Sequence, residues 1–165
     1  MSAESFLSAV VEIAIAIAGF AGIVAAIRHR DIDRWALEEQ ILLRMLFTAS
    51  GAAICFALLP AVLSEAGLPG PTIWRAGSIS LLLFLFAIGA GRTRQFRKAG
   101  LVPKLPRAMP VWVICSALLQ ALNIHLEASW PYLVGTFLIV LNGFTFFLML
   151  LFGNTSEDDE AIKHS

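Results

Sequence analysis

The stretch "VEIAIAIAGFAGIVAAI", residues 11–27, decides the fold class of this chain. Its alternating Ile and Ala residues have the period of two that is typical of a strand, and Glu12 interrupts an otherwise apolar run. From Phe6 to Ile27 the run carries only that one charge, and its length suits a helix crossing a hydrocarbon core of about 30 Å. A strand of this length would leave backbone groups unpaired in lipid unless a barrel closed. We therefore predict a membrane-spanning helix.

The composition supports a membrane protein. The chain has 165 residues, of which 58% are hydrophobic and 15% are charged, and its mean hydropathy is +0.79. A soluble domain carries about a quarter charged residues and about half apolar ones. Cys55 and Cys115 both lie in apolar runs, which indicates free thiols buried in the membrane.

Five apolar runs predict an all-α bundle of five transmembrane helices. We expect the spans at residues 6–27, 40–63, 73–91, 111–125 and 132–153, in a single domain of residues 1–153. Asp33 is the expected N-cap of the second helix, with Trp35 at the membrane surface. The turns "EAGLPGPT" (65–72) and "LEASWP" (126–131) separate neighbouring spans, and the fourth span is the shortest. Residues 154–165 are expected to form an acidic, disordered tail.

Lysine and arginine residues predict the direction of the chain. Basic segments follow the first and third spans, whereas the segments before the first span and between the fourth and fifth contain no Lys or Arg. The positive-inside rule then places the N-terminus outside and the C-terminus and tail in the cytoplasm. We expect the membrane to be the inner (plasma) membrane of a bacterium. The outer loops are too short for a folded domain, so any activity is expected within the bilayer or on the cytoplasmic face.

One side of the first predicted helix carries only small residues. Ala14, Ala18, Gly22 and Ala26 form a ridge at i, i+4 spacing, which permits close approach of another helix in lipid. We expect this helix-packing face to contact other helices of the same chain. The alternative is a self-association face or the lining of a narrow pore, in a homo-oligomer or a larger membrane complex.

Polar residues inside the spans are the candidate functional site. We predict a cluster of Glu12, Gln120, Asn123 and His125 at similar depth in the outer leaflet, to which Arg75 could also reach. Asn142, in the middle of the fifth span, is expected to hydrogen-bond to another helix. The cluster could mark a proton or ion route, or it could hold the bundle together.

The segment between the third and fourth spans is basic. It carries six Lys and Arg residues and no acidic residue: Arg92, Arg94, Arg97, Lys98, Lys104 and Arg107. We expect these side chains to contact anionic lipid headgroups of the bilayer, and we expect no binding of nucleic acid because no recognition module is present.

No pattern in the chain indicates an enzyme. A glycine-rich phosphate loop, a zinc signature and a nucleophile elbow are all missing from the sequence. We therefore expect no catalytic residue, no cofactor and no metal. The predicted function is a non-catalytic packing, accessory or scaffold subunit in the membrane. The alternative is a small oligomeric ion or proton channel or transporter that uses the polar cluster around Glu12.

Overall fold

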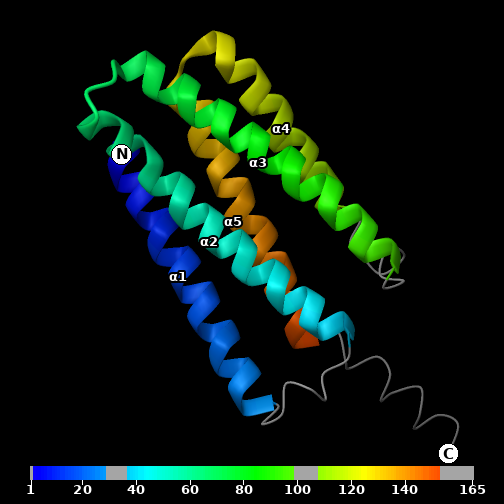
Figure 1. Cartoon of the computed structure of the whole chain (residues 1–165). Helices are drawn as coiled ribbons and strands as arrows, with labels where there is room; N and C mark the ends of the chain where they lie inside the picture. Colours follow the sequence, from blue (N-terminus) through cyan, green and yellow to red (C-terminus); the bar gives the residue numbers. More distant parts are fainter. Residues whose placement is uncertain (1, 29–36, 99–107, 153–165) are drawn as a thin grey trace, which may run out of the picture.

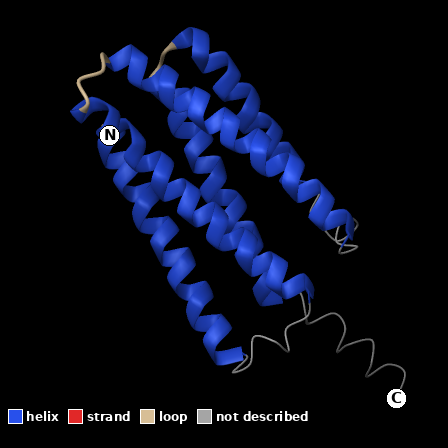
Figure 2. Cartoon of the chain, in the orientation of Figure 1, coloured by secondary structure: helices blue, strands red, loops and turns tan. Residues whose placement is uncertain are grey.

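The chain folds into an all-α bundle of five helices (Figure 1). The computed structural model describes residues 2–28, 37–98 and 108–152, and within these ranges it contains no strand (Figure 2). The helices are α1 (Ala3–Arg28), α2 (Leu37–Glu65), α3 (Gly70–Lys98), α4 (Ala108–Leu126) and α5 (Ser129–Phe152). Consecutive helices run in opposite directions. We call the end with the N-terminus and the two short connections the turn end, and the opposite end the linker end (Figure 1).

Helix α2 ends in a backbone motif that requires a glycine. Gly67 has a φ of 79° and donates its N–H to the Ser64 carbonyl at 2.9 Å, and the Leu68 N–H reaches the Leu63 carbonyl at 3.2 Å. These two bonds form a Schellman motif, in which a left-handed residue satisfies the last carbonyls of a helix. The predicted turn between the second and third helices is present, but it is shorter than residues 65–72, because α2 ends at Glu65 and α3 begins at Gly70.

Four of the helices in the described part of the chain are long and apolar enough to cross a membrane. These segments are Ala3–Ile27, Glu39–Glu65, Gly70–Gly89 and Ser129–Phe152. The apolar part of α4 is only Val111–Leu126, which at about 1.5 Å per residue covers about 24 Å, less than the hydrocarbon core. By length and composition, the protein is a membrane helical bundle with four full-length candidate spans and a shorter fourth helix.

The basic segment was expected to lie between the third and fourth spans, but its first part belongs to a helix. Residues 92–98 continue α3 as helix, so Arg92, Arg94, Arg97 and Lys98 lie on its last two turns, at the linker end. Helix is favoured there because Arg, Gln and Lys are good helix formers and the first proline comes at position 103. Lys104 and Arg107, the predicted cap Asp33, Trp35 and the acidic tail lie outside the described residues.

Helix α5 occupies the middle of the bundle and packs against all four other helices. α1 packs against α2 and α5, whereas α4 packs against α3 and α5, so α1 and α4 lie on different sides of α5 (Figure 1). α2 and α5 approach each other closely at Gly143, where an added Cβ would lie 3.3 Å from the Ala49 Cβ. This arrangement decides which polar side chains can meet.

Candidate functional site

Two of the predicted site residues, Gln120 and Asn123, are completely buried between α4 and its neighbours. The Gln120 Nε2 donates to the Pro131 carbonyl at 3.0 Å, and the Ser116 Oγ donates to the Gly135 carbonyl at 3.4 Å. Gly135 is required for this contact because a Cβ there would overlap the Gln120 amide. Polar side chains of α4 therefore bind the backbone of the first two turns of α5.

Asn123 connects α4 to α3 and to the start of α5. Its Nδ2 donates to the Ser78 Oγ at 2.8 Å, and its Oδ1 accepts the backbone N–H of Ala128 at 3.0 Å. Ser78 is also fully buried, so this hydrogen bond is shielded from lipid and water. A buried amide that uses both its donor and its acceptor fixes the positions of the groups around it.

Tyr132 supplies a hydrogen bond that α2 cannot make by itself. Pro60 lies inside α2 and has no N–H, so the carbonyl of Phe56, four residues earlier, lacks its helical donor. The Tyr132 Oη donates to that carbonyl at 2.6 Å. The Tyr132 ring lies over Gly77 of α3, where a Cβ would come within 2.8 Å of the ring, and its centroid is 5.8 Å from that of Trp74. Tyr132 thus joins α2, α3 and α5.

We call Ser78, Ser116, Gln120, Asn123 and Tyr132 the buried polar cluster. All five are at most 2% exposed. Polar groups bounded by lipid must find partners inside the protein, and each of these side chains makes at least one hydrogen bond to another helix or to the α4–α5 connection. Within this cluster, the Gln120 Oε1 is the one buried side-chain oxygen that lacks a hydrogen-bond partner among the described residues.

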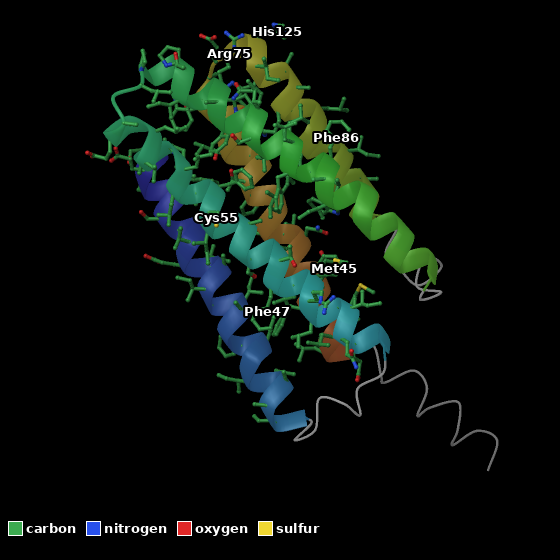
Figure 3. The ribbon with its side chains drawn as sticks, in the orientation of Figure 1. Met45, Phe47, Cys55, Arg75, Phe86 and His125 are labelled. Carbon is green, nitrogen blue, oxygen red and sulfur yellow. The ribbon has the colours of Figure 1, made fainter. Side chains whose placement is uncertain are left out.

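Arg75 pairs with a residue that the sequence prediction did not include. Its Nη1 lies 3.2 Å from the Glu127 Oε1, and both side chains are partly exposed at the turn end. Glu127 has a φ of 51° in the short connection between α4 and α5. His125, in the last turn of α4, is exposed at the same end (Figure 3). Neither Arg75 nor His125 pairs with Glu12. The predicted cluster around that carboxylate therefore does not include them.

Glu12 does not join Gln120 and Asn123. It is exposed on α1, and it has no hydrogen-bond or ion-pair partner among the described residues. Depth along the membrane, from which the sequence prediction grouped these residues, does not fix which helices are neighbours. Because α1 packs on α2 and α5, and α4 lies beyond α5, the predicted cluster separates into a buried part and an isolated carboxylate.

The predicted small-residue ridge of α1 becomes more exposed from its first residue to its last. Ala14 is fully buried, Ala18 and Gly22 are intermediate, and Ala26 is exposed. The buried residues of α1 are instead spaced by three and four: Leu7, Val10, Ala14, Ile17 and Ala21. A row at i, i+4 spacing is inclined to the helix axis, so it leaves a near-parallel interface, whereas a mean spacing of 3.5 stays in it.

A second stripe with the same spacing runs along the opposite side of α1. It is exposed throughout and consists of Ser5, Ser8, Glu12, Ala16, Gly19, Ile23 and Ala26. At 100° per residue its centre lies about 180° from that of the buried stripe. Nothing lies within 4 Å of a Cβ added at Gly19. We call this stripe the outward face of α1.

A groove adjoins the outward face at the turn end. It has a volume of about 680 Å³ and is lined by α1, by the last turns of α2 and by the first turns of α3. Glu4, Ser8 and Glu12 are on its α1 side, and Ser64 and Trp74 are on the other. The groove is mainly apolar with two carboxylates, so it fits a ligand that has an apolar body and a positive charge.

The remaining predicted residue, Asn142, is buried in α5 beside the close approach of α2. It is 9% exposed, and its Oδ1 has no hydrogen-bond partner in the part of the chain that the structure describes. The expected interhelical hydrogen bond of this oxygen is therefore not formed among the described residues. Cys55 and Cys115 are free and exposed on the surfaces of α2 and α4. No group of three metal-ligating side chains occurs among the described residues.

Ser78, Ser116, Tyr132 and Glu127 are the site residues that sequence reasoning missed. For Tyr132 a signal was present, because a proline inside a predicted span frees a carbonyl that some other donor must satisfy in lipid. Gly77 and Gly135 gave a weaker signal, since glycine on a spanning helix permits close packing. Nothing in the sequence connects Arg75 with Glu127, which lies 52 positions later.

Comparison with models of protein families, with curated proteins and with solved structures finds no match to this chain. Its function is therefore inferred from the arrangement of its own side chains.

Proposed function

We propose that this protein is a non-catalytic accessory or scaffold subunit that packs against another membrane protein through the outward face of α1. The observation that carries the proposal is the position of Glu12. It is an ionisable residue within a candidate span, and it points away from its own bundle. Ionisable residues in membranes almost always face protein or a water-filled cavity, because a charge in hydrocarbon is costly. Another protein on this face removes that cost.

The composition of the outward face supports the same function. Five of its seven residues are Ser, Ala or Gly, and their spacing of three and four is that of a helix-packing seam. Only 22% of the most apolar window of α1 is buried within the protomer, as in α3, against 44% in α2 and α5. The helix therefore has a free side whose pattern suits a further helix. We also propose that the chain crosses a bacterial inner membrane several times, with its N-terminus outside and its tail in the cytoplasm.

A matched pair of substitutions tests the interface. Gly19→Leu places a large side chain on the outward face, and Gly51→Leu places the same side chain on an exposed part of α2; both positions have open space within the protomer. The full chain, purified from its native membrane in mild detergent, is analysed by native mass spectrometry. We expect a complex heavier than the 17.9 kDa protomer that Gly19→Leu abolishes and Gly51→Leu preserves. A wild-type monomer, or a complex indifferent to Gly19→Leu, would contradict the proposal.

One observation favours a channel as a second candidate. Ser5, Ser8 and Glu12 follow one another along the outward face, so copies arranged around a common axis would line a path with hydroxyl and carboxyl groups. This candidate requires ion or proton flux in proteoliposomes that Glu12→Gln abolishes. Flux equal to that of empty liposomes removes it and leaves the accessory function.

A further inference from the structure

Glu12 lies well inside the apolar length of α1. The candidate span Ala3–Ile27 has 25 residues, which at about 1.5 Å each is about 37 Å and exceeds the hydrocarbon core by about 7 Å. Glu12 is nine positions from the start of the span, so its Cα lies about 10 Å inside the core when the span is centred. Glu4 and Arg28 bound this apolar length, and Glu12 is the charge between them. Its charge therefore needs a partner within the bilayer.

The described part of the protomer provides no cation for that role. Arg75 is paired with Glu127 at the turn end, and His125 is exposed there on α4. Arg44 is seven positions from the start of α2 at the linker end, so it lies about 10 Å along the bundle from that end, while Glu12 lies about 24 Å from it. A difference of this size exceeds the reach of an arginine side chain.

A second copy of the chain gives the wrong charge. Two copies in the same orientation that share the outward face bring Glu12 against Glu12 at equal depth, and like charges at close distance destabilise an interface. Charge complementarity therefore favours a partner with a basic residue at this depth. The groove of about 680 Å³ beside Glu12 is suited to the long stem of such a side chain, with Glu4 towards the membrane surface and Trp74 on the opposite wall.

We infer that the outward face of α1 receives a transmembrane helix of a different protein, which carries a lysine or arginine in the half of its span that lies at the turn end. This inference rests on the proposed accessory function and names the chemistry of the partner. The small residues Ala16 and Gly19 allow the partner helix to pack closely against α1. The carboxylates of Glu12 and Glu4 bind the cation of that helix.

The test uses the full chain in lipid nanodiscs and three synthetic spanning peptides of Leu and Ala. One peptide carries a single Lys in one half of its length, and in the others the same position is Leu or Glu. Association is measured by resonance energy transfer between labelled peptide and labelled protein. We expect the Lys peptide to bind at least tenfold more tightly than the other two. Glu12→Gln should remove this preference, and Glu12→Lys should transfer it to the Glu peptide.

Equal binding of the three peptides would overturn the inference, and so would an unchanged Lys preference in Glu12→Gln. Glu12-dependent energy transfer between two copies of the chain without peptide would also overturn it, because the occupant would then be a second copy. The two proposals fail separately. If Gly19→Leu disrupts the native complex but Glu12→Gln does not, the interface stands and the basic partner falls. If Gly19→Leu leaves the complex intact, the interface itself is wrong.

Discussion

The buried polar cluster and the outward face of α1 both place polar side chains within the apolar length of a helix, but their partners differ. In the cluster, α3, α4 and α5 surround Gln120 and Asn123, and the hydrogen bonds close within one protomer. On the outward face, Glu12 has no partner among the described residues. In both regions an unpartnered polar group in lipid is costly, and a carboxylate costs more than an amide or a hydroxyl. The first region therefore stabilises the protomer, and the second indicates what binds to it.

The largest expected effect comes from breaking the cluster at Gly135. Gly135→Val places a side chain where the Gln120 amide lies, so it displaces that amide and separates α4 from α5. We expect a loss of about 2–3 kcal/mol in the free energy of unfolding, as for overpacking of a well-packed core. Unfolding by SDS in mixed micelles, followed by circular dichroism, measures it. The matched control is Gly51→Val, where an added Cβ meets open space; an equal loss there would show that the effect is not specific to the cluster.

The next effect tests the bond that Pro60 makes necessary. Tyr132→Phe removes the donor to the Phe56 carbonyl and leaves that buried acceptor unsatisfied, for an expected cost of about 1–2 kcal/mol. In the Pro60→Ala background the alanine N–H restores the helical donor, so Tyr132→Phe should cost less. A double-mutant cycle in the same unfolding assay gives the coupling. Additive costs would mean that the two residues act independently.

A smaller effect is expected at the exposed rim of the cluster. Arg75→Met removes the ion pair with Glu127, whose two side chains are 53% and 36% exposed. Exposed ion pairs contribute about 0–1 kcal/mol, and the contribution falls with added salt. Unfolding at low and high salt should therefore separate wild type from Arg75→Met by at most that amount, with convergence at high salt. If Arg75→Met lowered the free energy of unfolding as much as Gly135→Val, the ion pair would be as important to stability as the buried polar cluster, contrary to this prediction.

The smallest effect on the protomer is expected at Glu12. Because its carboxylate has no partner among the described residues, Glu12→Gln should change the unfolding free energy of the protomer in detergent by less than about 0.5 kcal/mol. The same substitution should weaken association with a partner helix. A strong destabilisation of the isolated protomer would show that Glu12 belongs to the fold, and the contrast between the two regions would then disappear.

The sequence by itself determined the fold class and the positions of the helices. Each of the five predicted apolar runs corresponds to one helix, and both predicted turns are present, although each is shorter than predicted. These features are local, because the thickness of the hydrocarbon core and the need to satisfy the backbone within each segment act on one stretch at a time. The short apolar length of the fourth helix could likewise be predicted from its own stretch of sequence.

Only the tertiary structure decided which polar side chains meet. Gln120 and Asn123 were recognised as site residues, but their partners on α3 and α5 were not, and Glu12 was grouped with them. Periodicity gives the angle between residues on one helix. It does not show which side of that helix faces the bundle, or which helix is its neighbour. Those depend on packing among all five helices, which leaves α1 and α4 on different sides of α5 and Glu12 facing outward.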